Sequence, residues 1–79
     1  MAKSTGYVDN LLAAVDTGCV AFRHDSGVVE NFVIYSSGAP GAAARVWMSM
    51  LSDAASNSKY VELTHGDTGG QISGVKIFR

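Results

Sequence analysis

Apolar residues between positions 40 and 55 recur at the spacing of a one-sided helix. They stand at i, i+3, i+4 and i+7, which places them on the same side of a helical turn. The stripe consists of Ala43, Val46, Trp47, Met50, Leu51 and Ala54. Pro40 suits the first turn, because its missing N–H is not needed there, and Asn57 or Ser58 ends the helix. The pattern predicts a helix over 40–55 that supplies much of the core.

An earlier set of apolar residues has the spacing of a shorter helix over 6–16. One face of that helix would carry Tyr7, Val8, Leu11, Leu12 and Val15. Ser4 or Thr5 would cap its N-terminus, and Gly18 would end it in the left-handed conformation that glycine adopts readily. Tyr and Val are also good strand formers, so a strand is the alternative for the start of this segment.

Two runs rich in β-branched and aromatic residues follow, at 19–24 and 28–35. The short turn Asp25-Ser26-Gly27 joins them, which is typical of a β-hairpin. Both faces of the runs carry apolar residues, whereas a sheet with one solvated face alternates more cleanly. We therefore expect this hairpin to be central in the sheet, or its outer face to contact something else.

The segments 59–65 and 72–78 predict a second pair of strands, and Gly74 in the latter indicates a bulge. The element order is then α-β-β-α-β-β. We expect a single domain of residues 1–79 with an α+β fold, in which the helices pack on one face of a four-stranded antiparallel sheet.

Composition limits where the protein acts and what it contacts. Hydrophobic residues make up 47% of the chain and charged residues only 16%, so part of the apolar material is expected to face a partner or a second copy. Cys19 is the single cysteine, which excludes an internal disulfide and fits a reducing compartment. No signal peptide or membrane-spanning run is recognisable. We expect a cytoplasmic protein without membrane contact.

The charge pattern argues against direct nucleic-acid binding. Net charge is −1, and the six Lys and Arg residues are spread along the chain. Nucleic-acid binders usually gather basic residues on one face to neutralise phosphates. We expect no direct nucleic-acid partner.

The motif Asp-Thr-Gly occurs twice, with Asp16 and Asp67 at its first position. In aspartic proteases two such aspartates share a proton, so a DTG-type protease is a remote alternative. The second copy lies within GDTGG, which is similar to the nucleophile motif of serine proteases, with Thr68 at the serine position. A chain of this length cannot hold the two barrels and the distant His and Asp of that class. Turns and helix caps explain both motifs better.

His24 and His65 each close a predicted strand. If the hairpins lie side by side, the two imidazoles could share a metal with Asp25 or Asp67. Ordinary surface histidines are the better interpretation, and Cys19 is better explained as a small apolar residue than as a nucleophile. We expect no catalysis, no cofactor and no bound metal.

About half of the chain, from Ser37 to Thr64, carries a recognisable combination of features. It begins a helix with Gly-x-Pro-Gly-Ala-Ala-Ala at 38–44, spaces methionines along it at Met48 and Met50, and leads through Asn57-Ser58 into Tyr-Val-x-Leu at 60–63. A strand, an acidic glycine turn at 25–27 and another strand precede it. In these features the chain resembles small phage-encoded anti-CRISPR proteins that inhibit type I systems.

The resemblance implies a non-enzymatic inhibitor that binds a subunit of a CRISPR surveillance complex and blocks target DNA binding or nuclease recruitment. Candidate partner-binding residues on the outer side of the long helix are Arg45, Met48, Ser49 and Asp53. Candidates on turns and strands are Asp25, Glu30, Glu62 and Asp67, whose carboxylates suit a channel lined by Lys and Arg. The alternative is a small homodimeric structural or accessory domain of a phage.

Overall fold

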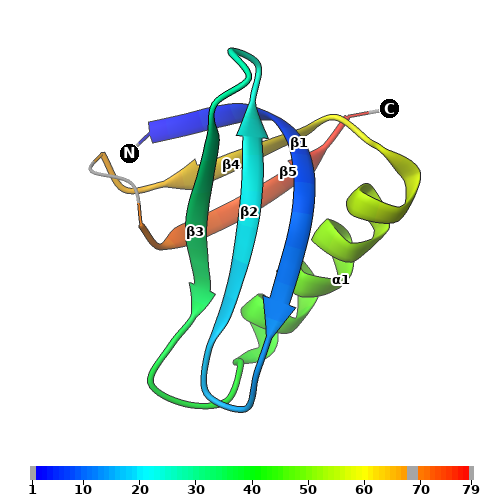
Figure 1. Ribbon diagram of the computed structural model, residues 1–79. Helices are drawn as coiled ribbons and strands as arrows, with labels where there is room; N and C mark the ends of the chain where they lie inside the picture. Colours follow the sequence, from blue (N-terminus) through cyan, green and yellow to red (C-terminus); the bar gives the residue numbers. More distant parts are fainter. Residues whose placement is uncertain (1, 68–69, 79) are drawn as a thin grey trace.

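The computed structural model describes residues 2–67 and 70–78, which form five strands and one α-helix (Figure 1). The strands are β1 (Ala2–Ala13), β2 (Gly18–His24), β3 (Val29–Tyr35), β4 (Val61–His65) and β5 (Ile72–Ile77), and helix α1 spans Ala42–Asn57. The strands form an antiparallel sheet in the order β3-β2-β1-β4-β5. The α+β class fits, but the prediction of four strands and two helices is wrong.

The segment 6–16, predicted as a helix, belongs mostly to strand β1. A β-bulge between Val8 and Asn10 inserts one residue into the ladder with β2. Because of this insertion, Val8 and Leu11 both pack against the core. A bulge interrupts the two-residue alternation of a strand, and the resulting three-residue spacing resembles a helix in the sequence.

Strand β1 is shared by the two halves of the sheet. Residues 2–6 pair with β4, and residues 6–13 pair with β2. Figure 1 shows β1 running along the β4–β5 pair and then bending to continue beside β2. At the bend, a Cβ atom on Gly6 would overlap the carbonyl oxygen of Arg23. Glycine therefore allows the backbones of β1 and β2 to approach closely where β1 changes partners.

The two ends of the sheet approach each other through β3 and β5. Val33 and Gln71 form a parallel bridge, the Val33 N–H donates to the Gly70 carbonyl oxygen over 2.7 Å, and the Gln71 side-chain Nε2 donates to the Ile34 carbonyl oxygen over 2.8 Å. With α1 inserted between β3 and β4, this topology is that of a five-stranded, partly open barrel of the OB type.

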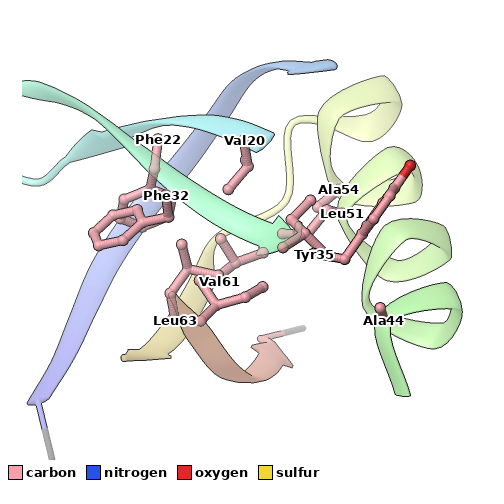
Figure 2. Close-up of a cluster of buried hydrophobic side chains, with 11 residues drawn as sticks. Val20, Phe22, Phe32, Tyr35, Ala44, Leu51, Ala54, Val61 and Leu63 are labelled. Carbon is pink, nitrogen blue, oxygen red and sulfur yellow. The ribbon is translucent and has the colours of Figure 1, made fainter. Parts of the chain in front are cut away.

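The core lies between the two halves of the folded sheet. Its buried apolar residues are Val20, Phe22, Phe32, Ile34, Tyr35, Ala44, Leu51, Ala54, Val61, Leu63 and Ile72. Figure 2 shows the side chains of Phe22 and Phe32 close to those of Val61 and Leu63, with Leu51 and Ala54 of the helix nearer the other end. Alternating residues of β2, β3 and β4 supply most of this interior, as a packed barrel requires.

Helix α1 forms as the apolar spacing predicts, but it is rotated about its axis. Its buried residues are Ala44, Leu51 and Ala54, whereas Val46 is 57% exposed. Ser58 ends the helix in the left-handed conformation and donates its N–H to the Ala54 carbonyl oxygen, as the sequence indicates. Within residues 2–67 and 70–78 no helix has the length and apolar character needed to cross a membrane.

The remaining strand predictions are confirmed. The hairpin of β2 and β3 turns at residues 25–28, where Gly27 adopts a φ of 94°. Val61 and Leu63 are buried on one face of β4. A register shift opposite Ser73 confirms the irregularity predicted beside Gly74.

Replacing Gly6 with alanine tests whether the bend of β1 depends on this close approach. The new Cβ must displace the β2 backbone, so we expect Gly6→Ala to lower the free energy of unfolding by about 1–3 kcal/mol, the usual cost of overpacking. Urea denaturation followed by circular dichroism measures this loss.

Gly74→Ala is the matched control, because an added Cβ at this strand glycine meets Thr64 only at 3.4 Å, an ordinary contact. We expect it to be neutral or to stabilise by up to about 1 kcal/mol. Equal effects of the two substitutions would contradict the role assigned to Gly6.

Candidate functional site

The residues that the sequence singled out fall in separate regions of the molecule. Arg45, Met48, Ser49 and Asp53 lie on α1; Glu30 lies at the start of β3; Asp67 lies in the β4–β5 loop; Asp25 and Glu62 belong to the β2–β3 turn and to β4. Of these, Asp25 and Glu62 border the same part of the sheet, because Thr5 of β1 is the β4 partner of Glu62 and also bonds to Asp25.

The helix residues do not form one outward-facing group. Arg45, Ser49 and Asp53 are exposed, and Asp53 is held by Lys59 over 2.7 Å. Met48 is partly buried and packs against the core, so the expectation that it lies off the core stripe is wrong. Trp47, Leu51 and Ala54 of the predicted stripe do face the core, but Ala44 and Met48 contact it in place of Ala43, Val46 and Met50.

Glu30 and Asp67 lie apart from Asp25. The Glu30 carboxylate contacts His24 Nε2 over 2.8 Å, and Asp67 is exposed. Thr68 of the GDTGG motif lies outside the described residues. Asp25 contacts Tyr60 just before β4, whereas Asp67 follows the other end of that strand, so the acidic residues do not form a common cluster.

Asp25 is the centre of a hydrogen-bonded junction between three elements. Its Oδ2 accepts hydrogen bonds from the Thr5 hydroxyl of β1 over 2.6 Å and from the Tyr60 hydroxyl over 2.7 Å. Its backbone N–H donates to the Thr5 carbonyl oxygen over 3.1 Å. The β2–β3 turn is thereby fixed against β1 and the start of β4.

The same hydrogen bonds affect the pKa values of the Asp25 carboxyl group and the Tyr60 hydroxyl group. The Thr5 and Tyr60 hydroxyls lower the pKa of Asp25, because they stabilise its carboxylate. A hydrogen bond with Thr5 lowers the pKa of Tyr60, but the hydrogen bond to Asp25, desolvation and the nearby negative charge together raise it. At neutral pH the junction therefore holds an ionised carboxylate beside two neutral hydroxyl groups.

Aromatic side chains continue from this junction across the outer face of β1, β4 and β5. Tyr7 and Tyr60 meet edge to face with ring centroids 5.4 Å apart, and Tyr60 and Phe78 lie 5.5 Å apart. The Lys76 ammonium lies over the Phe78 ring, 4.9 Å from its centroid. Tyr7 is 46% exposed, so the strip presents ring surface to solvent.

Charged residues of both signs surround these rings. Lys3 contacts Glu62 over 3.9 Å, and Glu62 lies opposite Lys76 in the β4–β5 ladder. On the β2 side, Arg23 pairs with Asp9 over 2.7 Å. We call the group of Thr5, Tyr7, Asp25, Tyr60 and Phe78, with Lys3, Glu62 and Lys76 at its border, the Tyr60 surface.

Sequence reasoning missed the aromatic part of this surface. Because Val61 and Leu63 are buried, Tyr60 and Glu62 lie on the outer side of the sheet, but sequence reasoning gave Tyr60 no role. Tyr7 was assigned to a helix, so its position beside Tyr60 could not be foreseen. The available signal was the alternation in β4 and β5, which puts Tyr60, Glu62 and Lys76 on a common side.

The histidines and the Asp-Thr-Gly aspartates have local partners or lie far apart. His65 is buried between Ser4, whose hydroxyl lies 2.8 Å from Nε2, and the Phe32 ring. Among residues 2–67 and 70–78, no three His, Cys, Asp or Glu side chains are grouped so that they could hold a metal ion. Asp16 follows the end of β1, whereas Asp67 follows β4, which pairs with the beginning of β1. The two aspartates therefore lie at opposite ends of β1 and cannot share a proton within one chain.

Comparison of the chain with protein-family models, with curated proteins and with solved structures gives no match. The assignment of a site therefore depends on the geometry and chemistry of the side chains alone.

The pKa shift of Asp25 predicts how the junction responds to pH. Because its pKa in the folded state is lowered, the carboxylate stabilises the fold above the ordinary aspartate pKa of about 3.9, and this contribution is lost as the pH falls through the lowered value. Asp25→Asn should therefore be less stable than the wild type at pH 7, and the difference should shrink as the pH falls through the lowered pKa of Asp25. Urea denaturation at a series of pH values measures the difference.

Thr5→Val is the accompanying control, because it removes the largest cause of the shift. In that background the pH-dependent cost of Asp25→Asn should shrink. A cost that is unchanged by Thr5→Val, or that does not shrink as the pH falls, would contradict the junction described above.

Proposed function

We propose that this chain is a non-catalytic inhibitor that binds a protein partner through the Tyr60 surface. The observation that carries the proposal is the partly exposed aromatic strip of Tyr7, Tyr60 and Phe78, bordered by charges of both signs. Tyrosine-rich patches with a polar border are typical of protein interfaces, because each ring supplies a large contact area and a hydroxyl. The described residues enclose no pocket, so the contact is with a surface.

A protein partner fits this chain better than a nucleic acid does. Barrels of the OB type often bind oligonucleotides or oligosaccharides on the face of strands 2 and 3. In this chain the outer residues of β2 and β3 are Cys19, Ala21, Arg23, Val29, Asn31 and Val33. This set contains no aromatic ring for stacking on a base, and its one cation pairs with Asp9.

The resemblance of residues 37–64 to anti-CRISPR proteins supports a more specific proposal, in which the partner is a subunit of a type I CRISPR surveillance complex. The inhibitor would then act in the cytoplasm of a phage-infected cell and block target DNA binding or nuclease recruitment. Asp25 and Glu62 belong to the Tyr60 surface and remain candidate acidic contacts with the partner. Met48 is no longer a candidate, because it packs against the core.

Self-association is a second candidate, favoured by the exposed side of α1. Val46 is 57% exposed, and Ala43 and Met50 lie on the same side of the helix. This apolar stripe is separate from the Tyr60 surface, and a second copy of the chain could cover it.

Pull-down with purified type I surveillance complexes tests the proposal. Tyr7→Ala removes an exposed ring, and we expect it to weaken binding at least about tenfold, as for an interface hot spot. Arg45→Glu changes the charge of an exposed helix residue away from the Tyr60 surface and should alter binding less than about threefold.

Both variants must first show the wild-type circular dichroism spectrum, and sedimentation of the free chain serves as the control for self-association. A strict monomer contradicts the second candidate. Loss of binding in Arg45→Glu but not in Tyr7→Ala would move the interface to the helix. Absence of binding to every type I complex would overturn the CRISPR proposal.

A further inference from the structure

We propose that Asp25, Tyr7 and Tyr60 form a site for a guanidinium group, so that the Tyr60 surface receives an arginine side chain of its partner. This inference rests on the proposed function, because it names the chemistry of the contact that the partner would make. It also makes a separate claim about this chain, which can be tested without the partner.

The carboxylate of Asp25 is ionised, oriented and open to a ligand. The Thr5 and Tyr60 hydroxyls both donate to Oδ2, and among the described residues no side-chain hydrogen bond ends on Oδ1. Asp25 is exposed. A carboxylate held in this way keeps acceptor capacity on Oδ1 for a donor that arrives from outside.

No Lys or Arg of the described residues neutralises that carboxylate, and the neighbouring His24, which also acts on Asp25, contacts Glu30 over 2.8 Å. Arg23, which lies opposite Tyr7 in the β1–β2 ladder, is engaged by Asp9 over 2.7 Å. Lys3 is closest to Glu62, at 3.9 Å. Among residues 2–67 and 70–78, Asp25 forms no ion pair with Lys or Arg, so its charge is available to a partner.

The neighbouring rings suit a flat cation. The Tyr7 and Tyr60 rings meet at 65° with their centroids 5.4 Å apart, and Tyr7 is about half exposed. A guanidinium can stack on such a ring while its N–H groups bond to a carboxylate beside it. The same strip already holds one cation over a ring, because Lys76 lies 4.9 Å from the Phe78 centroid.

The hydrogen-bond donors and acceptors of the site favour a cation over a neutral sugar as its ligand. The Thr5 and Tyr60 hydroxyls have both directed their protons to Asp25, so Oδ1 is left as an acceptor and, of the hydroxyls in the site, only that of Tyr7 is left as a donor. A guanidinium brings only donors and matches this set, whereas a saccharide hydroxyl needs donors for its own lone pairs as well. Guanidinium is favoured over ammonium because its planar fork can bond and stack together.

Titration of the ¹⁵N-labelled chain with N-acetyl-arginine amide at 150 mM salt, followed by NMR, tests the site. We expect saturable shifts in the amide signals of Thr5, Tyr7, Asp25 and Tyr60. N-acetyl-citrulline amide has nearly the same shape without the charge and should produce no saturable shift. Asp25→Asn should weaken arginine binding by about tenfold, and Tyr60→Phe, which keeps the ring and the carboxylate, by less than about threefold.

Asp53→Asn is the matched control, because Asp53 is an exposed carboxylate that already pairs with Lys59 on another part of the molecule. It should leave arginine binding unchanged. Equal shifts with citrulline, an unchanged affinity in Asp25→Asn, or saturable binding of methyl glycosides in place of arginine would overturn the inference.

The two proposals fail in distinguishable ways. If the arginine probe binds and Asp25→Asn abolishes the effect while no surveillance complex is captured, the site stands and the CRISPR proposal fails. If a complex is captured and Asp25→Asn does not weaken it, the proposed function stands and the guanidinium site is overturned.

Discussion

The bend of β1 at Gly6 is the constraint on which the rest of this structure depends. One strand pairs with β4 through its first half and with β2 through its second, so the position of the bend determines how the two halves of the sheet enclose the core. It also determines where the β2–β3 turn lies. Gly6 pairs with His24 of β2 and with Val61 of β4. Asp25 and Tyr60 are the sequence neighbours of those two residues, so this pairing brings them to the same place.

The sequence was sufficient to predict the elements that depend on short-range apolar spacing and on turn residues. Helix α1 and the β2–β3 hairpin follow from spacing and turn residues, and the structure confirms them. It was insufficient for β1, because the bulge after Val8 gave a strand the apolar spacing of a helix. It also misplaced the buried side of α1. The apolar residues cover a wider arc of the helix than the contact with the barrel buries. Their spacing therefore does not show which of them stay exposed, as Val46 does.

The candidate site was only partly predictable for a related reason. Asp25 could be selected as an acidic turn residue, but its partners Thr5 and Tyr60 lie 20 and 35 positions away in the sequence. Their proximity depends on the path of β1, which the sequence pattern concealed. The partly exposed aromatic strip therefore became visible only when the strand order was known, and it moves the proposed interface from the helix to the outer face of the barrel.

Hydroxyl-radical footprinting of the chain, free and bound to a surveillance complex, tests the central claim most directly. The aromatic side chains report on separate regions: Tyr7, Tyr60 and Phe78 on the Tyr60 surface, and Trp47 on the helix. The account predicts that Tyr7, Tyr60 and Phe78 lose reactivity on binding while Trp47 keeps it. Protection of Trp47 with unchanged reactivity at Tyr7 and Tyr60 would contradict it.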